Sequence, residues 1–141
     1  MVIADWNGDG KTDLAVTNSL GNSITVYRNT GTNDLAFATE VTLATGFSPR
    51  GLHAADIDGD GRPELVSANF FSRNISVFRN SSTGTAISFL PANSFATSAI
   101  SDGPYSVTSG DVDGDGKPDL ALAGHGEVHV LKNESTPGVI R

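Results

Sequence analysis

An acidic stretch of nine residues occurs three times in the chain, at residues 5–13, 56–64 and 111–119. The copies share the pattern D-x-[DN]-G-D-G-x-x-[DE], in which positions 1, 3, 5 and 9 carry side-chain oxygen and positions 4 and 6 are glycine. A hard cation such as calcium takes six to eight oxygen ligands, so a short loop that binds it must turn sharply. Glycine permits the positive φ angles of such a turn. The pattern therefore predicts a cation site that the chain repeats three times.

Each loop is expected to supply four side chains and the backbone carbonyl of position 7. The predicted ligands are Asp5, Asn7, Asp9, Lys11 and Asp13 in the first loop, Asp56, Asp58, Asp60, Arg62 and Glu64 in the second, and Asp111, Asp113, Asp115, Lys117 and Asp119 in the third. We expect Ca²⁺ rather than Mg²⁺, at about three ions per chain, because a crowded cage of protein oxygens suits the larger ion, which dehydrates readily. Carboxylates held this close repel one another, so folding and cation binding should be coupled.

Two other interpretations of the loops were weighed. The EF-hand starts in the same way but requires a glutamate at position 12 and flanking helices. Position 12 here is Val16, Ser67 or Leu122, each inside a strand-like segment, which excludes the EF-hand. Alternatively, Asp-Gly sequences could merely form tight turns between strands. Three evenly spaced copies favour the cation site over this alternative.

Each loop is followed by short strand-like segments. The first segment is apolar (residues 14–16, 65–68 and 120–123), and the second alternates apolar and polar residues up to an asparagine (24–29, 75–80 and 128–133). A third strand is expected at residues 37–43 and 87–89, although Pro91 disfavours the latter. A fourth strand should run from Leu52 or Val107 into the next loop. No segment shows sustained helical periodicity.

The spacing of the loops predicts the fold class. The first residues of the loops are 51 and 55 positions apart, and four short antiparallel strands per repeat of this length form the blade of a β-propeller. A β-sandwich would not need the same loop at the same strand junction three times. We therefore expect an all-β chain of about three blade repeats in one domain, residues 1–141. Counted from the loops, the repeats are 5–55, 56–110 and an incomplete 111–141.

The repeated residues also resemble a known family. A strand that starts at proline, the acidic loop, an L-A-V-like strand and an I-x-V-Y-R-N-like strand are similar to FG-GAP/VCBS repeats, which also build the integrin α-chain propeller and some fungal lectins. The departures are small: Asn7 and Glu64 replace aspartates, and Thr12 stands where the other loops have proline. The resemblance implies a calcium-stabilised, non-catalytic module for extracellular or cell-surface recognition or adhesion. It leaves open a lectin with sites between blades, or a propeller appendage of an extracellular carbohydrate-active enzyme.

Composition excludes several classes of protein. The chain lacks cysteine, so thiolate metal sites, disulfides and thiol nucleophiles are absent. Its net charge of −7 comes largely from the loops, and three divalent cations would nearly cancel it, so neither nucleic acid nor a basic partner is expected. No apolar run is long enough to insert in a membrane. The histidines (His53, His125 and His129) have no nucleophile or carboxylate at a recognisable catalytic spacing, so we expect no enzyme activity.

The number of blades bears on the partners. Propellers close with four to eight blades, which hides the strand edges, but this chain has three loops. We therefore expect a partial propeller, or one completed by oligomerisation with a dimer favoured, in which residues 1–4 add a fourth strand to a neighbour's last blade. The expected ligand is a protein or a glycan.

Aromatic residues divide into two groups by their place in the repeats. Residues within strands are expected in the core: Tyr27, Phe37, Phe78 and Phe89. Residues near strand ends or turns could face solvent: Phe47, Phe70, Phe71 and Tyr105. Exposed aromatic faces beside polar groups would suit a sugar ligand. The apolar residue at position 2 of each loop is expected to pack into the blades: Trp6, Ile57 and Val112.

Overall fold

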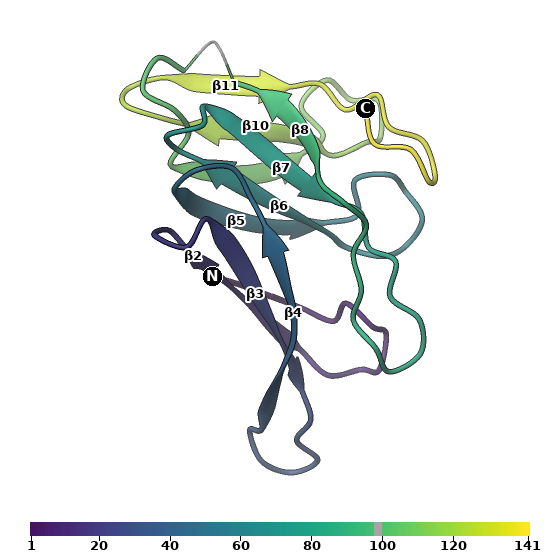
Figure 1. Cartoon of the computed structure of the whole chain (residues 1–141). Coiled ribbons are helices and arrows are strands. Elements are labelled where there is room, and N and C mark those ends of the chain that lie inside the picture. The colour runs from purple at the N-terminus through teal and green to yellow at the C-terminus, as the bar shows by residue number, and fades with distance from the viewer. Residues whose placement is uncertain (98–99) are drawn as a thin grey trace.

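The computed structural model describes residues 1–97 and 100–141, and the secondary structure of these residues consists of β-strands (Figure 1). The strands are β1 (Val2–Ala4), β2 (Asp13–Asn18), β3 (Ser23–Asn29), β4 (Phe37–Ala44), β5 (Pro49–Ala55), β6 (Glu64–Asn69), β7 (Asn74–Phe78), β8 (Asn93–Ala96), β9 (Ser106–Gly110), β10 (Asp119–Ala123) and β11 (Val128–Leu131). The all-β fold class is confirmed. Within the described ranges, no helix is long and apolar enough to cross a membrane.

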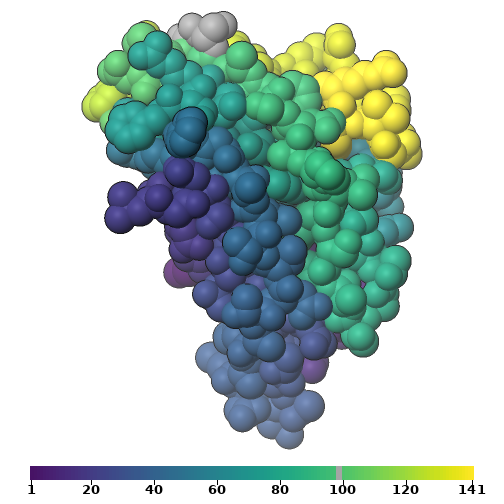
Figure 2. Space-filling model, in the orientation of Figure 1, coloured from purple at the N-terminus to yellow at the C-terminus, as the bar shows by residue number. Residues whose placement is uncertain are grey.

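The strands form three antiparallel sheets, which we call blades 1 to 3. Their strand orders are β1-β2-β3-β4, β5-β6-β7-β8 and β11-β10-β9. The sheets follow one another in a fan, with blade 1 at the bottom and blade 3 at the top of Figure 1. In Figure 2, the hairpin between β3 and β4 projects at the bottom and the C-terminal segment lies at the upper right. Successive meandering sheets of this kind are the blades predicted for a partial β-propeller.

Each acidic loop joins the first and second strands of its blade, so the blades begin one strand before the loops. The N-terminal segment illustrates this, because Val2 pairs with Ala15 and Ala4 pairs with Asp13 within the first sheet. The expectation that residues 1–4 would add a strand to a neighbour's last blade is therefore wrong. These residues are already the first strand of blade 1.

Two predictions about the outer strands also fail. The strand expected at residues 87–89 lies instead at β8, beyond Pro91, where it pairs with β7 as the fourth strand of blade 2. Phe89 forms an isolated bridge to Asn80, and the side chain of Ile87 packs between blades 1 and 2. Phe37, expected in the core, is 44% exposed at the start of β4.

The core consists of two apolar layers between successive blades. The first layer joins Trp6, Ala15, Ile24, Val26 and Leu43 of blade 1 to Leu65, Phe78 and Ile87 of blade 2. The second joins Ile57, Val66, Ala68, Ile75 and Val77 of blade 2 to residues of blade 3 and of the segments flanking it, namely Ile100, Val107, Leu120, Leu122 and Ile140. Neighbouring residues of β6, Leu65 and Val66, therefore point to opposite layers, as period-two alternation requires.

Buried asparagines connect the blades through hydrogen bonds. The Asn80 Nδ2 group, just after β7, donates to the Trp6 carbonyl of blade 1 at 3.0 Å and to the Pro63 carbonyl of its own blade at 3.1 Å. One blade further, the Asn133 Nδ2 group donates to the Ile57 carbonyl at 2.8 Å. Because amide groups buried without partners are costly, these bonds fix how one blade sits on the next.

Candidate metal centres

The aspartate at position 1 organises the backbone of each acidic loop. In loop 2, the N–H groups of Gly59 and Gly61 donate to the two carboxylate oxygens of Asp56 at 2.8 and 2.9 Å. Both glycines have positive φ, 76° and 87°, which a side chain would disfavour. Asp5 and Asp111 accept the equivalent pairs of bonds in the other two loops. The glycines of the sequence pattern thus let the chain wrap around its first acid.

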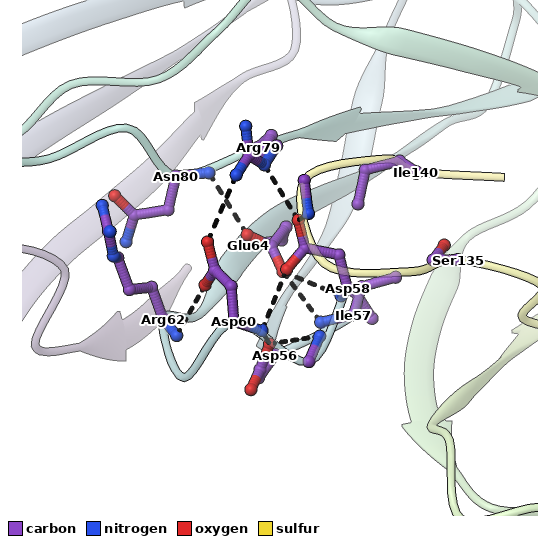
Figure 3. Close-up of polar contacts among 12 residues, drawn as sticks. Asp56, Ile57, Asp58, Asp60, Arg62, Glu64, Arg79, Asn80, Ser135 and Ile140 are labelled. Atoms are coloured by element: carbon purple, nitrogen blue, oxygen red, sulfur yellow. Dashed lines mark hydrogen bonds and ion pairs between the residues drawn. The ribbon is translucent and has the colours of Figure 1, made fainter.

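The acid at position 9 fastens each loop to its blade. Glu64 is fully buried and accepts hydrogen bonds from the N–H groups of Ile57 (2.8 Å), Asp58 (3.4 Å) and Asn80 (3.2 Å), as Figure 3 shows. The equivalent acids, Asp13 and Asp119, each accept bonds from the N–H of position 2 of the loop and from the N–H of the asparagine at or just after the end of the third strand, Asn29 or Asn133. The closing ligand of the sequence pattern is therefore also a structural acceptor.

The environments of these three acids differ. Burial raises the pKa of Glu64 to about 7, against the opposing effect of the N–H groups that bond it. Burial also raises the pKa of Asp13. At Asp119, the N–H groups of Asn133 and Val112 hold the pKa of the carboxyl below its usual range. Desolvation thus has the largest effect on the pKa of the position 9 acid in loops 1 and 2, whereas hydrogen bonding has the largest effect in loop 3.

The structure gathers some of the predicted ligands into clusters. One oxygen each from Asp56, Asp58 and Glu64 lies within 4.8 Å of the others, and the same holds for Asp111, Asp113 and Asp115. In loop 1, the Asn7 amide instead donates to Asp9 at 3.2 Å. Loops 2 and 3 therefore bring three acids each to one point, and within the described residues no such group of three acids forms in loop 1.

Basic side chains form ion pairs with the acids of loops 2 and 3. The Arg79 guanidinium donates to Asp58 at 2.8 Å and to Asp60 at 3.4 Å, and both contacts are drawn in Figure 3. Lys132, the equivalent residue of blade 3, bonds to Asp113 and lies 3.5 Å from Asp115.

These pairs were not predicted, although a basic residue precedes the asparagine in all three repeats, which is a visible signal. In blade 1 the equivalent Arg28 turns away from its loop and bonds to Glu40 at 3.2 Å. The contacts show that the acids at positions 3 and 5 attract positive charge.

The remaining positions of the loops give mixed results. The side chains of Arg62 and Lys117 donate to the carbonyls of Ser82 and Ser135, while the role of their own carbonyls as ligands, and that of Lys11, stays a prediction. At position 2, Trp6 and Ile57 are 1% and 4% exposed, as expected. Val112, however, is 63% exposed, so the prediction that it packs into the blades is wrong.

The donor chemistry of the loops fits a hard cation. Three acids lie together at positions 1, 3 and 9 of loop 2 and at positions 1, 3 and 5 of loop 3, and both loops already hold a positive side chain there. A bound Ca²⁺ would neutralise these acids and cross-link the loop to its blade. The residues that would hold it are those of positions 1, 3, 5 and 9.

The opposite end of the blades carries an aromatic cluster. The Arg50 guanidinium carbon lies 4.0 Å above the ring centre of Phe70 and 4.7 Å above that of Tyr105. The Tyr105 hydroxyl shares a hydrogen bond of 2.6 Å with His125, and the Phe71 ring lies beside that of Phe70 with ring centres 5.0 Å apart and planes tilted by 54°. Of the residues expected to face solvent, Phe47 and Phe71 do so, whereas Phe70 and Tyr105 are half-buried. At the same end, the Phe71 N–H donates to the Phe47 carbonyl at 3.2 Å.

Comparison with known proteins gives one clear result. The family model of the FG-GAP-like repeat matches the chain twice, over residues 5–67 and 59–122. The first match includes loops 1 and 2, and the second includes the end of loop 2 and all of loop 3, which agrees with the succession of blades. A comparison with curated proteins found no match.

Proposed function

Because the chain belongs to the FG-GAP-like repeat family, we propose that it is a calcium-stabilised, non-catalytic β-propeller module for extracellular recognition or adhesion. The observation that carries this proposal is the acidic loop at the same strand junction of all three blades, with three acids brought together in loops 2 and 3. A catalytic site would concentrate its chemistry at one place. Here the concentrated chemistry recurs once in each blade, which suits a stabilising role.

Calcium supports the fold in this proposal by offsetting charge repulsion. Asp58 is 2% exposed and Asp60 lies beside it, and Arg79 is the one basic side chain in the described structure that bonds to both. A divalent ion adds charge that Arg79 alone does not supply. Extracellular calcium modules work at Kd values of about 10⁻⁴ to 10⁻³ M, and short carboxylate loops would suit that range, which supports an extracellular site of action.

Removal of calcium is expected to lower the melting temperature by about 5 to 10 °C, since a ligand at 100 times its Kd stabilises a protein by about 2.7 kcal/mol. Differential scanning calorimetry in excess calcium and in chelator measures the shift. The double variant Asp111→Asn/Asp113→Asn should lose part of the shift, because loop 3 would lose two charged ligands. Asp34→Asn, which changes an exposed acid outside the loops, should keep it. Identical melting curves with calcium and with chelator would contradict the proposal.

A lectin is the second candidate, and the aromatic cluster supports it. Phe71 is 70% exposed next to the Phe70–Arg50–Tyr105 stack, and an exposed ring beside polar groups is suited to the apolar face of a sugar. Phe71→Ala should then reduce binding on a glycan array at least tenfold in saturating calcium. Leu20→Ala changes the repeat-equivalent residue of the β2–β3 turn and should leave binding intact. Equal binding by both variants, or none by the unaltered chain, would reject the lectin.

A further inference from the structure

Each blade has a face that points to the next blade along the chain, here called its forward face. Three repeat-equivalent residues mark it: position 2 of the acidic loop and two alternate residues of the third strand. They are Trp6, Ile24 and Val26 in blade 1 and Ile57, Ile75 and Val77 in blade 2. All six are at most 4% exposed, because the following blade covers them.

The forward face of blade 3 is apolar and uncovered. Its equivalent residues are Val112, Val128 and Val130, with exposures of 63%, 74% and 41%. Isolated exposed valines are common, but these three occupy positions that are core in both preceding blades. Apolar residues thus occupy the same three positions in blade 3, but no following blade packs against them in the described chain.

Blade 1 has the complementary open surface on its opposite, backward face. In blade 2 this face presents Leu65 and Phe78, which are 0% and 2% exposed against blade 1. The equivalent residues of blade 1, Leu14 and Tyr27, pair with each other across β2 and β3 and are only half-buried. No blade of the described chain packs over them.

The polar contacts between blades repeat this asymmetry. Asn80 and Asn133 each donate to the position 2 carbonyl of the preceding blade's loop, at 3.0 and 2.8 Å. Within the described structure, the equivalent Asn29 Nδ2 group donates only to the Thr12 carbonyl of its own blade, at 3.2 Å. Among the described residues, no asparagine side chain bonds to the equivalent carbonyl of loop 3, that of Val112. The Asn29 amide donor in blade 1 and the Val112 carbonyl acceptor in blade 3 are therefore both left without the contact that joins neighbouring blades, at opposite ends of the described chain.

Next to this bond, the hairpin after each third strand contacts position 3 of the preceding loop. The Asn7 amide donates to the Thr85 carbonyl at 3.1 Å, and the Gly138 N–H donates to Asp58 at 3.0 Å. The equivalent Asp113 has no hairpin beside it in the described structure, and it is bonded by Lys132 of its own blade. The uncovered face of blade 3 thus lacks both contacts that a following blade supplies.

We propose that the forward face of blade 3 binds the backward face of blade 1 of a second copy of this chain. The Asn29 amide of one copy then donates to the Val112 carbonyl of the other, as Asn80 and Asn133 do within the chain. The interface continues two that already exist in the molecule, with the same residue positions on both sides. It joins two different surfaces head to tail, and two copies supply six sheets, which lies within the range of closed propellers. The proposal rests on the blade architecture and not on calcium binding.

Sedimentation velocity of the purified chain tests this proposal over a wide range of concentration. The mass should rise from 14.6 kDa toward twice that value as the concentration increases. Val112→Asp and Asn29→Ala should each raise the dissociation constant at least tenfold, with unchanged circular dichroism because both residues lie outside the buried layers. Leu20→Asp, at a fully exposed residue of the β2–β3 turn, is the matched control and should associate like the unaltered chain.

A mixture of the two variants tests the head-to-tail geometry. Val112→Asp chains keep an intact blade 1 and Asn29→Ala chains keep an intact blade 3, so the mixture retains one normal interface per pair. Association should therefore recover in the mixture relative to either variant alone. A chain that stays at 14.6 kDa at all concentrations overturns the proposal. Equal association of Val112→Asp and Leu20→Asp, or no recovery in the mixture, also overturns it.

Discussion

Replacement of Glu64 by alanine is expected to lower the free energy of unfolding by about 3 to 5 kcal/mol. The carboxylate is completely buried and accepts hydrogen bonds from the N–H groups of Ile57, Asp58 and Asn80. Alanine leaves these donors without a partner in a site that water does not reach, and it also creates a cavity. Because domains of this size are stable by only about 5 to 15 kcal/mol, the loss is a large part of the total.

Urea denaturation in the presence of chelator measures this loss apart from any bound cation. Glu64→Gln should have a smaller effect, since the amide keeps one oxygen as an acceptor. Glu134→Ala removes an exposed glutamate that follows Asn133 and serves as the control, with an expected change below about 0.5 kcal/mol. If Glu64→Ala and Glu134→Ala unfold at the same urea concentration, the structural role of Glu64 is wrong.

Replacement of Gly103 by alanine is expected to cost about 3 to 4 kcal/mol. A Cβ at this position would lie 1.9 Å from the Phe70 carbonyl oxygen, far inside contact distance, and the φ angle of Gly103 is 94°. The steric overlap with Phe70 adds to the backbone strain at Gly103. Neither the β6–β7 turn nor the segment leading to β9 can move to relieve the overlap without breaking backbone hydrogen bonds. The Phe70 N–H bonds to Ser48 at 3.0 Å and holds that turn in place.

Gly84→Ala separates backbone strain from overlap. Gly84 also has a positive φ, 63°, but no atom lies within 4 Å of a Cβ built there. It should therefore cost only about 1 to 2 kcal/mol, the penalty for a left-handed residue with a side chain. Chemical denaturation of the two variants compares them directly. Equal losses for Gly103→Ala and Gly84→Ala would show that the contact with Phe70 contributes nothing.

Much of the fold could be predicted from local pattern. The runs at residues 14–16, 65–68 and 120–123 are apolar, and the segments that end at Asn29, Asn80 and Asn133 alternate, so their strands were recognisable. The fourth strand of blade 2, β8, was not, because Ile87 resembles a strand residue but packs in the apolar layer between blades 1 and 2. Periodicity reports that a residue is buried and does not report which neighbour buries it.

The same distinction separates the predicted and missed features of the loops. The aspartates and glycines of the loops can be recognised from sequence alone because their spacing is fixed within nine residues. The contact of Arg79 with Asp58 joins residues 21 positions apart, and it depends on how β7 is placed beside the loop. Val112 occupies the position of Trp6 and Ile57, yet it is exposed because burial there depends on a following blade. A single repeat carries no signal for the presence of its neighbour.

The asparagine at the end of the third strand has a consequence for how such chains lengthen. At both junctions of the described chain, the later blade supplies an amide donor and the earlier blade supplies a carbonyl acceptor. A duplicated gene segment that encodes one blade therefore brings both halves of the contact with it. Insertion or loss of a blade restores the same junction on either side without compensating substitutions, so blade number can change in evolution while the joint stays constant.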